Sequence, residues 1–401
     1  MAQSGKVIIL NNSGVSRLQD PVVISRDVLS SFVSMPEEEG KVLVLSEKGR
    51  KIPAQLDDIN ADGRWDELAF QIDIERNSKK EIRLRWVEKE DAPVYEIKTR
   101  ACLGLSENRN GKYLPVNREI MPESAGEVQM AGRYRSEGPV WENENLAFRH
   151  FFDSRNNTDI FGKTRPCLIA DSLDLSSPEF LSLQPKGMNI LEVKSTLGAG
   201  GFALIYRGLP IPLQHSSSAI FRLLASGPVR SVIEFTYEGW RVGDQNYDVR
   251  RRISVWAGKN WFKNEIMVSG FTGERELAIG LANTQNPKPP LYITHNLVFN
   301  SLCTHSLQSR NRDALGMGLL FPSRIFSGYG QTPPCRQEQP TDTLCHSQFA
   351  KIKIRSGELI EYSFFAGWEK SESRFATTRY FTELLQEEAD RRENPLQLLA
   401  K

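Results

Sequence analysis

Alternating apolar and polar positions mark the first part of the chain as β-structure. In residues 68–74 every second side chain is apolar, and residues 81–86 repeat the pattern. Because successive side chains of a strand point to opposite faces, each segment predicts a strand with one buried face. Asn77 and Ser78 supply a turn between the segments, so the two strands are predicted to form a hairpin.

The character of the chain changes twice further along. Residues 88–130 are charged and rich in Gly, Asn and Pro, which is typical of a linker or a long covering loop. Strand patterns resume near Val140 and continue to about Trp368. Helical spacing occurs only near the C-terminus, where Pro395 ends it. The apolar positions of that helix are Phe381, Leu384, Leu385 and Ala389.

These segments predict an all-β protein with two domains. We expect a small N-terminal β-sandwich over residues 1–92, a linker or covering loop over 93–130, and a large antiparallel β domain over 131–401 that ends in a short helix. No internal repeat of about 20–50 residues is present, which disfavours a propeller or a solenoid.

Composition and charge narrow the functional classes. The 401 residues carry 51 Lys and Arg against 50 Asp and Glu, a net charge of +1. This balance excludes a strongly basic nucleic-acid binder. A hydrophobic content of 39% is typical of globular rather than disordered chains. No window reaches about 18 consecutive apolar residues, so no membrane span is expected.

The five cysteines are widely spaced and include no C-x-x-C pair, which argues against a zinc ribbon or a thioredoxin-like motif. Cys335 and Cys345 flank a Pro-rich loop. They could pair in an oxidising compartment, and two free thiols are the equal alternative.

An Asp-rich loop lies just before the strand at 68–74. Four residues with oxygen ligands occupy positions 1, 3, 5 and 9 of a calcium-type loop: Asp58, Asn60, Asp62 and Asp66. Gly63 stands at the sharp turn, but Ala69 replaces the bidentate Glu of an EF-hand. The loop predicts either a structural Ca²⁺ site or a plain Asp-Gly turn.

The richest polar stretch runs from Trp141 to Arg155. If residues 146–152 form a strand, His150 shares a face with apolar neighbours, whereas Arg149 and Arg155 share the other face. That polar face is either a solvated surface or the wall of a groove in which an arginine grips a carboxylate with two parallel hydrogen bonds. His150 is either a hydrogen-bonded core histidine or a functional group.

Aromatic residues lie near Gly, Asn and Asp at several places, among them Trp141, Trp240, Tyr247 and Trp368. Sugar sites stack such rings on a pyranose while nearby polar groups bind the hydroxyls. The same rings would also fill a large β core. Gly198–Gly201 lacks the Gly-Lys-Ser/Thr ending of a phosphate loop and predicts a turn, so we expect no organic cofactor.

Several short segments carry a resemblance to a known family. In chain order they are Asp57–Leu68, Gly138–Glu142, Arg149, Arg155, Asp159, Gly162-Lys163 and Asp313–Gly318. Together they resemble the DUF4861 family, bacterial proteins of polysaccharide-utilisation systems, over about Val7 to Phe375. The resemblance implies a galactose-mutarotase-like β-supersandwich and work on oligosaccharides or polysaccharides that contain uronic acids.

The activity linked with that family is dehydration of a terminal uronic residue to a 4,5-unsaturated sugar. A base removes the C5 proton, the 4-hydroxyl leaves as water, and a cation must neutralise the sugar carboxylate. Arg149 or Arg155 is our candidate for that cation. The candidates for base and acid are His150, Lys163 and Tyr247.

The strand pattern and the family match also suggest supporting roles. Because Arg149 and His150 alternate along a strand, Lys163 is favoured as the closer partner of Arg149. Glu142 and Asp159 are expected to orient the cations. The expected substrate-binding residues are Trp141, Glu142, Asp159, Trp240 and Trp368.

Two other classes stay open beside the lyase. A glycoside hydrolase on the same sugars needs two carboxylates at a set separation, for which Glu142 with Asp159 or Glu369 could serve. The second class is a non-catalytic sugar-binding protein, which needs no catalytic base and no pair of carboxylates.

The location of the protein is also left open by the sequence. Family members usually carry a signal peptide, which implies a periplasmic or secreted protein. The apolar run Val7–Leu10 is too short for a signal-peptide core, so a cytoplasmic protein fits as well as one whose signal has been removed.

Overall fold

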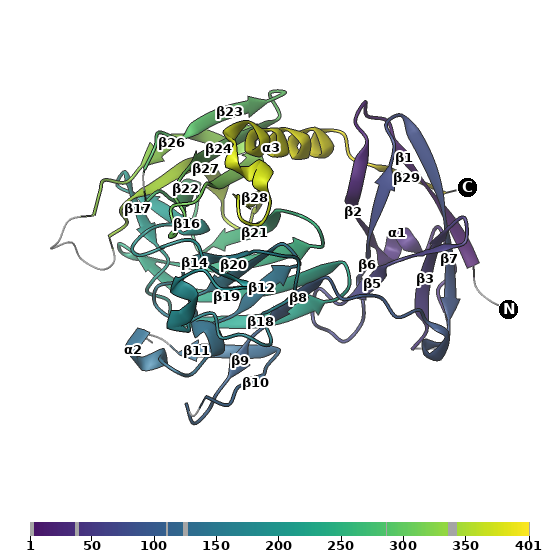
Figure 1. Cartoon of the computed structure of the whole chain (residues 1–401), viewed down its shortest axis with the longest axis horizontal. Coiled ribbons are helices and arrows are strands. Elements are labelled where there is room, and N and C mark those ends of the chain that lie inside the picture. The colour runs from purple at the N-terminus through teal and green to yellow at the C-terminus, as the bar shows by residue number, and fades with distance from the viewer. Residues whose placement is uncertain are drawn as a thin grey trace.

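Two β-structured parts of unequal size make up the chain (Figure 1). The computed structural model describes residues 4–36, 40–109, 111–122, 127–285, 287–335 and 343–400. Strands dominate these ranges, which confirms the predicted all-β class. None of the helices in the described ranges is long and apolar enough to cross a membrane.

The smaller part is a sandwich of two antiparallel sheets, as predicted. One sheet has the strand order β29-β1-β7-β3-β4, with β1 (Ser4–Asn11), β3 (Val42–Glu47), β4 (Arg50–Ile52), β7 (Ser78–Val87) and β29 (Gln397–Ala400). The other has the order β2-β6-β5, with β2 (Arg17–Ser25), β5 (Ala54–Asp57) and β6 (Glu67–Ile74). The short helix α1 (Arg26–Leu29) adds Leu29 to the apolar core between them.

The predicted hairpin between β6 and β7 is wrong. The two strands are consecutive, but β6 pairs with β2 and β5, whereas β7 pairs with β1 and β3. Their apolar faces meet across the sandwich, where Phe70 and Leu84 belong to one core cluster. Alternation therefore identified the buried face of each strand, but it carries no information about which strand lies alongside.

The last strand of the described chain, β29, belongs to the small sandwich. Strand β29 pairs antiparallel with β1, with Val7 opposite Ala400 and Leu10 opposite Gln397. Figure 1 shows the two strands side by side. The small sandwich thus includes residues from both ends of the chain, and the last strand does not belong to the large domain, where we expected it.

The large domain is built on a nine-stranded antiparallel sheet with the order β11-β18-β19-β20-β21-β28-β25-β24-β23. The bounds are β11 (Arg118–Pro122), β18 (Ser218–Ser226), β19 (Arg230–Val242), β20 (Gln245–Trp256), β21 (Trp261–Ser269), β23 (Leu291–His295), β24 (Phe299–Ser306), β25 (Leu315–Pro322) and β28 (Leu359–Trp368).

Two five-stranded sheets cover one face of this sheet. The first has the order β15-β14-β13-β12-β8, with β8 (Thr99–Cys102), β12 (Val140–Asn143), β13 (Leu146–His150), β14 (Thr158–Lys163) and β15 (Gly187–Asn189). The second has the order β17-β16-β22-β27-β26, with β16 (Ala199–Tyr206), β17 (Leu209–Pro212), β22 (Glu274–Ala282), β26 (Phe326–Gln331) and β27 (Ser347–Arg355). One continuous apolar core lies between the layers, as a supersandwich requires.

Residues 93–130 differ from the predicted linker or covering loop. This segment contributes β8 to a five-stranded sheet and β11 to the edge of the nine-stranded sheet, and it also holds the small pair β9 (Gly104–Leu105) and β10 (Leu114–Pro115). Helix α2 (Glu127–Met130) follows. Short strands at sheet edges tolerate polar residues, which is why composition suggested a loop.

Helix α3 (Thr378–Glu393) covers the other face of the nine-stranded sheet, so the predicted C-terminal helix is confirmed. Thr377 caps it by accepting a hydrogen bond from the Tyr380 N–H group at 3.4 Å. Phe381 and Leu385 pack on residues of β24, β25 and β28, including Phe365. The neighbouring Phe364 points into the opposite core, so β28 is buried on both faces.

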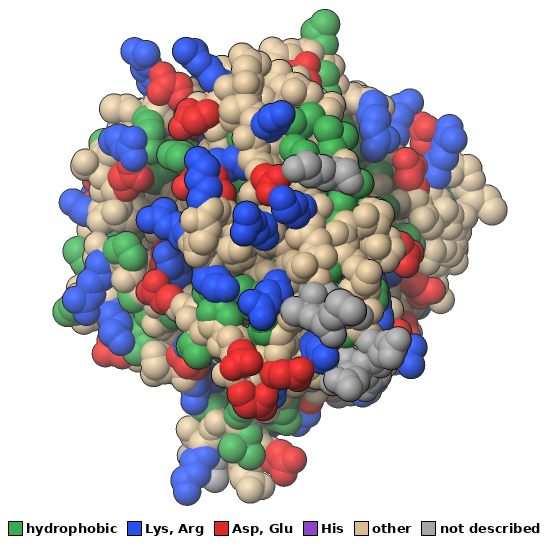
Figure 2. Space-filling model, turned by 90° about the vertical axis from the view of Figure 1, so that its right-hand side faces the viewer, with side chains coloured by type: hydrophobic (Ala, Val, Ile, Leu, Met, Phe, Trp, Pro, Cys, Tyr) green, Lys and Arg blue, Asp and Glu red, His purple; other side chains and the backbone are tan. Residues whose placement is uncertain are grey.

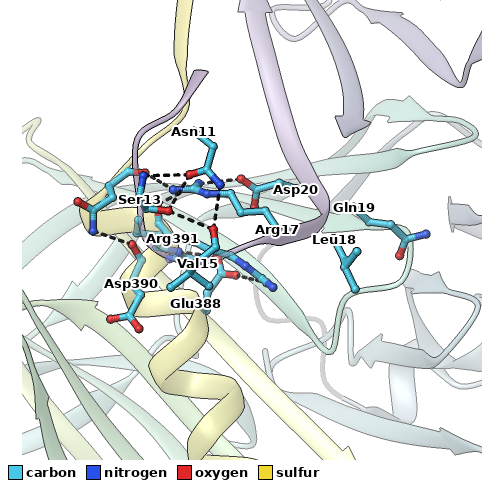
Figure 3. Close-up of polar contacts among 12 residues, drawn as sticks. Asn11, Ser13, Val15, Arg17, Leu18, Gln19, Asp20, Glu388, Asp390 and Arg391 are labelled. Atoms are coloured by element: carbon cyan, nitrogen blue, oxygen red, sulfur yellow. Dashed lines mark hydrogen bonds and ion pairs between the residues drawn. The ribbon is translucent and has the colours of Figure 1, made fainter. Parts of the chain in front are cut away.

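The C-terminal end of α3 joins the two domains through a buried arginine of β2. The Arg17 Nη1 group donates to Asp20 Oδ2 at 2.8 Å and to the Arg391 carbonyl oxygen at 3.4 Å. Its Nη2 group donates to the Asn394 carbonyl oxygen. Figure 3 shows Arg17 beside the last turn of the helix. A cation at this end satisfies unpaired carbonyl groups and complements the helix dipole.

Five short 3₁₀ turns complete the described structure: η1 (Lys89–Asp91), η2 (Arg135–Glu137), η3 (Pro178–Leu181), η4 (Ser323–Ile325) and η5 (Ser373–Ala376). The structure also joins Cys335 and Cys345 in a disulfide, with 5.1 Å between their Cα atoms. Of the two alternatives open at the sequence level, the paired form is therefore present.

Candidate active site

A pair of strands in the first five-stranded sheet brings the polar stretch of the sequence together. Strands β13 and β14 run antiparallel, and their register places Arg149 directly opposite Asp159. The Arg149 Nε group lies 3.2 Å from each carboxylate oxygen, and Nη2 lies 2.5 Å from Asp159 Oδ2. Nη1 donates to the Leu175 carbonyl oxygen at 3.2 Å. Asp159 therefore orients Arg149, the supporting role expected for it.

A second arginine follows on the turn after β13. Arg155 donates from Nε to both oxygens of Asp153 at 3.0 Å and from Nη2 to Glu137 Oε2 at 2.8 Å. The guanidinium carbons of Arg149 and Arg155 lie 4.5 and 4.0 Å from the centroid of the Phe151 ring. Phe151 thus holds the two cations near each other through cation–π contacts.

Both arginines line a cleft of about 640 Å³, a volume typical of small-molecule sites. Its walls come from the β13–β14 region, from the segment after β15, from the β17–β18 connection and from residues 343–344. The titratable residues that line it are Arg149, Arg155, Asp159, Glu192, Lys194, His215 and Arg310. Of the two alternatives left open for the polar face, the structure has the groove wall, and the groove contains Arg149, Arg155 and Asp159 from the sequence-based list.

Arg310 is a cleft residue that the sequence analysis missed. Its Nε atom is buried and has no hydrogen-bond partner within the described ranges. Its backbone N–H group donates to the Ile190 carbonyl oxygen at 2.8 Å, which fixes its position beside the first five-stranded sheet. The available signal was its place three residues before Asp313, where one of the segments behind the family resemblance begins.

Glu192 contributes a carboxylate to the cleft. Its oxygens accept from Gln285 at 3.2 Å and lie 3.3 Å from the Lys194 ammonium. Burial acts to raise the pKa of Glu192, but these hydrogen bonds outweigh burial and lower the pKa overall. Arg310 contributes to the lowering through its charge. Glu192 is therefore held as a carboxylate.

His215 is exposed and lines the same cleft from the connection between β17 and β18. It was set aside in the sequence analysis because it forms no metal-ligand spacing. No local pattern around it points to function, and only the fold brings it to the cleft that the arginines line. Among the described residues that line the cleft it is the only histidine.

Lys163 and Glu142 form a separate, closed ion pair on the same sheet, and both side chains have zero exposure. The Lys163 ammonium also donates to the carbonyl oxygens of Asn143 at 2.6 Å and Cys167 at 2.7 Å. Glu142 Oε1 accepts from the backbone N–H groups of Ile169 and Ala170 at 2.9 and 2.7 Å. Burial lowers the pKa of Lys163 against the opposing charge of Glu142.

This pair lies outside the cleft, so Lys163 is not the partner of Arg149 that we expected. Glu142 does orient a cation, as expected, but the cation is Lys163. The register of β12, β13 and β14 explains the difference, because Arg149 lies opposite Asp159 whereas Lys163 lies beyond the end of β13.

His150 lies on the opposite side of β13 from Arg149, in the core between the sheets. Its Nδ1 atom is 3.0 Å from Thr158 Oγ1, and its Nε2 atom is 3.3 Å from the Tyr237 hydroxyl. Burial and the charge of Arg251 lower the pKa of His150 well below its usual range. His150 is a neutral, hydrogen-bonded core residue in this fold.

The aromatic candidates also lie in the core. Trp141, Trp240, Tyr247 and Trp368 are all buried and belong to the main core cluster. Trp240 donates to the Pro212 carbonyl oxygen at 3.2 Å, and the Tyr247 hydroxyl donates to Gln245 at 3.1 Å. None of the four rings lines the cleft, so the structure offers them no contact with a sugar there.

Two glycines of the family-like segments permit close approaches near the site. A Cβ atom on Gly138, whose φ is 155°, would lie 2.1 Å from the His150 carbonyl oxygen. A Cβ atom on Gly162 would lie 2.5 Å from the Trp368 ring. Glycine at both positions lets β13 and β14 pack directly against their neighbours.

The Asp-rich loop is ordered by its own backbone. Asp66 Oδ2 accepts from the N–H groups of Ile59 and Asn60 at 2.7 and 3.0 Å, and Asp58 Oδ2 accepts from Gly63 at 2.7 Å. Asn60 Oδ1 and Asp62 Oδ1 likewise accept backbone hydrogen bonds. In the described part of the chain, no group of three or more His, Cys, Asp or Glu residues is arranged to hold a metal. Calcium binding by the loop stays a prediction.

The comparisons with known proteins decide the family. The model of the family described as "Domain of unknown function (DUF4861)" matches residues 9–398. This chain belongs to the DUF4861 family. The family assignment suggested by the short segments is therefore confirmed.

Individual relatives of this DUF4861 chain are distant. It is 20% identical to "Uncharacterized protein P7" of Formosa agariphila, and the match covers 98% of this chain and 92% of that protein. Among solved structures, an α-mannosidase from Enterococcus faecalis V583 gives a TM-score of 0.48 at 8% identity over 99% of this chain. A glycosyl hydrolase family 38 protein from Enterococcus faecalis gives the same TM-score and identity.

The DUF4861 chain spans less than half the length of those two solved structures, 46% and 47%. A TM-score of this size bears on neither activity nor substrate.

Proposed function

We propose that this protein is a carbon–oxygen lyase that binds the terminal uronic residue of an oligosaccharide in the Arg149–Arg155 cleft. The observation that carries the proposal is the charge of the cleft. Four of the side chains that line it are cations: Arg149, Arg155, Arg310 and Lys194. Carboxylates hold three of these cations, namely Asp159, the pair Asp153 and Glu137, and Glu192. Arg310 has no ion-pair partner among the described residues, and this uncompensated cation favours an anionic ligand.

Arg149 is the best-placed group for a sugar carboxylate. Two of its five N–H donors are directed at Asp159 and one at Leu175. Two donors are thus left for a ligand, and the side chain is held in one orientation before binding. Arg310 adds a buried Nε donor that has no partner among the described residues.

The elimination needs a base beside this cation. In our proposal the imidazole of His215 takes the C5 proton, the electron pair forms the C4–C5 double bond, and the C4–O bond breaks. His215 then returns that proton to the leaving hydroxyl, which departs as water, so the sugar loses one water in total. Arg149 stabilises the negative charge that builds up on the carboxylate when C5 loses its proton.

Glycoside hydrolysis fits the cleft less well. A hydrolase needs a protonated carboxyl group beside an ionised one, and the pKa of the acid must be raised. In this cleft the pKa of Glu192 is lowered, and both oxygens of Asp159 bind Arg149. Of the other carboxylates considered, Glu142 is buried in the closed pair and Glu369 does not line the cleft.

A periplasmic or secreted location is part of the proposal. It is supported by the Cys335–Cys345 disulfide, because disulfides persist mainly in oxidising compartments. Of the five cysteines, Cys102, Cys167 and Cys303 are free thiols. Thiol titration of the unfolded protein is expected to give three free thiols before reduction and five after it.

The ultraviolet absorbance of an unsaturated uronate tests the proposed reaction. The protein is incubated with oligosaccharides that end in glucuronate or galacturonate, and mass spectrometry follows the loss of one water. Rising absorbance without new reducing ends supports the lyase. New reducing ends without absorbance would instead establish a hydrolase, and binding without either would establish a sugar-binding protein.

A further inference from the structure

A second cationic surface lies on the small sandwich, away from the cleft. It is the outer face of the sheet β29-β1-β7-β3-β4, and we call it the outer basic face. Figure 2 shows Lys and Arg side chains gathered on this side of the molecule. Its cations are Lys6, Lys51, Lys79, Arg83 and Arg85.

The strand register arranges these cations in rows. Lys6 on β1 lies opposite Arg83 on β7, Arg83 lies opposite Ser46 on β3, and Ser46 lies opposite Lys51 on β4. One row across four strands therefore carries three cations, at about 4.8 Å from strand to strand. Arg85 stands two residues along β7, about 6.8 Å from Arg83.

Few carboxylates compensate this face. Glu81 is the one acidic side chain directed outward from the described strands of the sheet, and it pairs with Lys6 at 2.7 Å. Lys51, Lys79, Arg83 and Arg85 have no ion-pair partner among the described residues. The described strands of this face therefore carry a local excess of positive charge, although the net charge of the whole chain is only +1.

The shape of the face selects the kind of ligand. None of the described clefts is lined by these cations, and the face is a sheet surface with charges at regular intervals. Such a surface suits an extended polymer, which gains affinity from many weak contacts, better than a small anion that needs enclosure. The ring of Trp86 on β7 points into the core of the small sandwich. The described cations therefore have no aromatic ring beside them on which bases could stack. This disfavours single-stranded nucleic acid as the ligand.

We propose that the outer basic face binds the anionic polysaccharide whose chain ends the cleft processes. This inference rests on the proposed function for the choice of polysaccharide, whereas the charge arrangement stands without it. Carboxylate and sulfate groups would both be recognised as anions along an extended chain. The face would keep the enzyme on the polymer between reactions at chain ends, and it would have no role with short oligosaccharides.

Affinity electrophoresis in gels that contain polyglucuronate, dextran sulfate or neutral dextran tests the inference. The variant R83E/R85E removes two cations from the face. A matched control, K288E/R324E, makes the same change of charge at exposed positions of the large domain. Thermal unfolding of each variant confirms that it is folded.

We expect the anionic polymers to retard the wild-type protein and the control, and R83E/R85E to bind them about tenfold more weakly. Neutral dextran should retard none of them. Retardation by polyglucuronate alone or by dextran sulfate alone would identify the preferred anion and would still support the face. Equal retardation of wild type and R83E/R85E would overturn the inference, and so would an equal loss in the control.

Further measurements distinguish a failure of this inference from a failure of the proposed function. With short uronate-ended oligosaccharides, R83E/R85E should retain wild-type turnover, whereas with the polymer its KM should rise. If no substrate gives an unsaturated product but the polymer is still retarded through Arg83 and Arg85, the lyase fails and the face stands. Tighter binding of single-stranded DNA than of either polysaccharide by the wild-type protein would contradict the choice of partner.

Discussion

The Glu142–Lys163 and Arg149–Asp159 ion pairs lie on the same three strands, yet one is closed and the other borders the cleft. Glu142 and Lys163 have zero side-chain exposure, and three acceptors take up the Lys163 donors. Arg149 and Asp159 are 8% and 3% exposed, line the cleft, and leave two arginine donors unused.

The two pairs differ in how many of their N–H donors have no acceptor among the described residues. A buried pair whose donors and acceptors are all satisfied can hold loops and strands together but has nothing to offer a ligand. A pair with spare donors at a cleft wall keeps its arginine in position for an anionic group. We therefore assign the closed pair to stability and the open pair to substrate binding.

Breaking the closed pair is expected to give the largest effect. The variant Glu142→Gln leaves the Lys163 ammonium buried without its counter-charge, which should lower the free energy of unfolding by about 3–5 kcal/mol. Chemical denaturation measures the loss. The double variant Glu142→Gln/Lys163→Met should lose clearly less than the two single variants added together. A single variant of wild-type stability would contradict the structural role.

Breaking the open pair should affect turnover more than stability. The double variant Arg149→Met/Asp159→Leu removes both charges, so no unpaired charge stays behind in the site. It should fold, yet lose about 10²–10³-fold in kcat because the cation for the sugar carboxylate is gone. Arg149→Lys tests the geometry, since a lysine keeps the charge without the fork of donors. Full activity in the double variant would remove Arg149 from the reaction.

Arg310 offers a sharper test with a smaller effect. Its Nε atom has no partner in the described structure, so Arg310→Gln should leave stability within about 0.5 kcal/mol of wild type. The affinity for a uronate-ended oligosaccharide should fall about tenfold, an effect typical of one lost hydrogen bond to a charged group. Titration calorimetry measures it. Arg165→Gln, at an exposed position outside the cleft, serves as the control.

His150 should give the smallest effect, and it is visible only as a pH dependence. Because its pKa in the folded state is lowered, the unfolded state binds more protons as the pH falls below about 6.5. The folded state should then lose up to about 1.4 kcal/mol of stability per pH unit, and the loss should be absent above that pH. His150→Gln should flatten this slope. If the stability of the wild-type protein and of His150→Gln changed equally with pH, a buried, neutral His150 would be contradicted.

Local patterns predicted local structure well and long-range pairing poorly. The buried faces of β6 and β7 and the position of α3 follow from periodicity. The separation of β6 and β7 into different sheets and the return of β29 to β1 depend on contacts between distant segments. No window of the sequence contains that information.

The lack of long-range information in the sequence also explains which residues of the cleft could be predicted. Arg149, Arg155 and Asp159 lie close together in the sequence, and strand pairing brings them to one cleft, which was one of the two alternatives that the sequence left open. Arg310 and His215 come from distant segments, and only the fold adds them. The burial of His150, Lys163 and the tryptophans reflects a supersandwich covered on both faces, where polar residues are satisfied inside the core.

Recognition of the sugar carboxylate by Arg149 and Arg310 is the central claim, and titration calorimetry with two matched ligands tests it most directly. One ligand is a uronate-ended oligosaccharide, and the other is the same oligosaccharide with its carboxyl group reduced to an alcohol. The wild-type protein should bind the uronate at least about tenfold more tightly, and Arg149→Met/Asp159→Leu should abolish the preference. Equal affinity of the wild-type protein for both ligands would contradict the account.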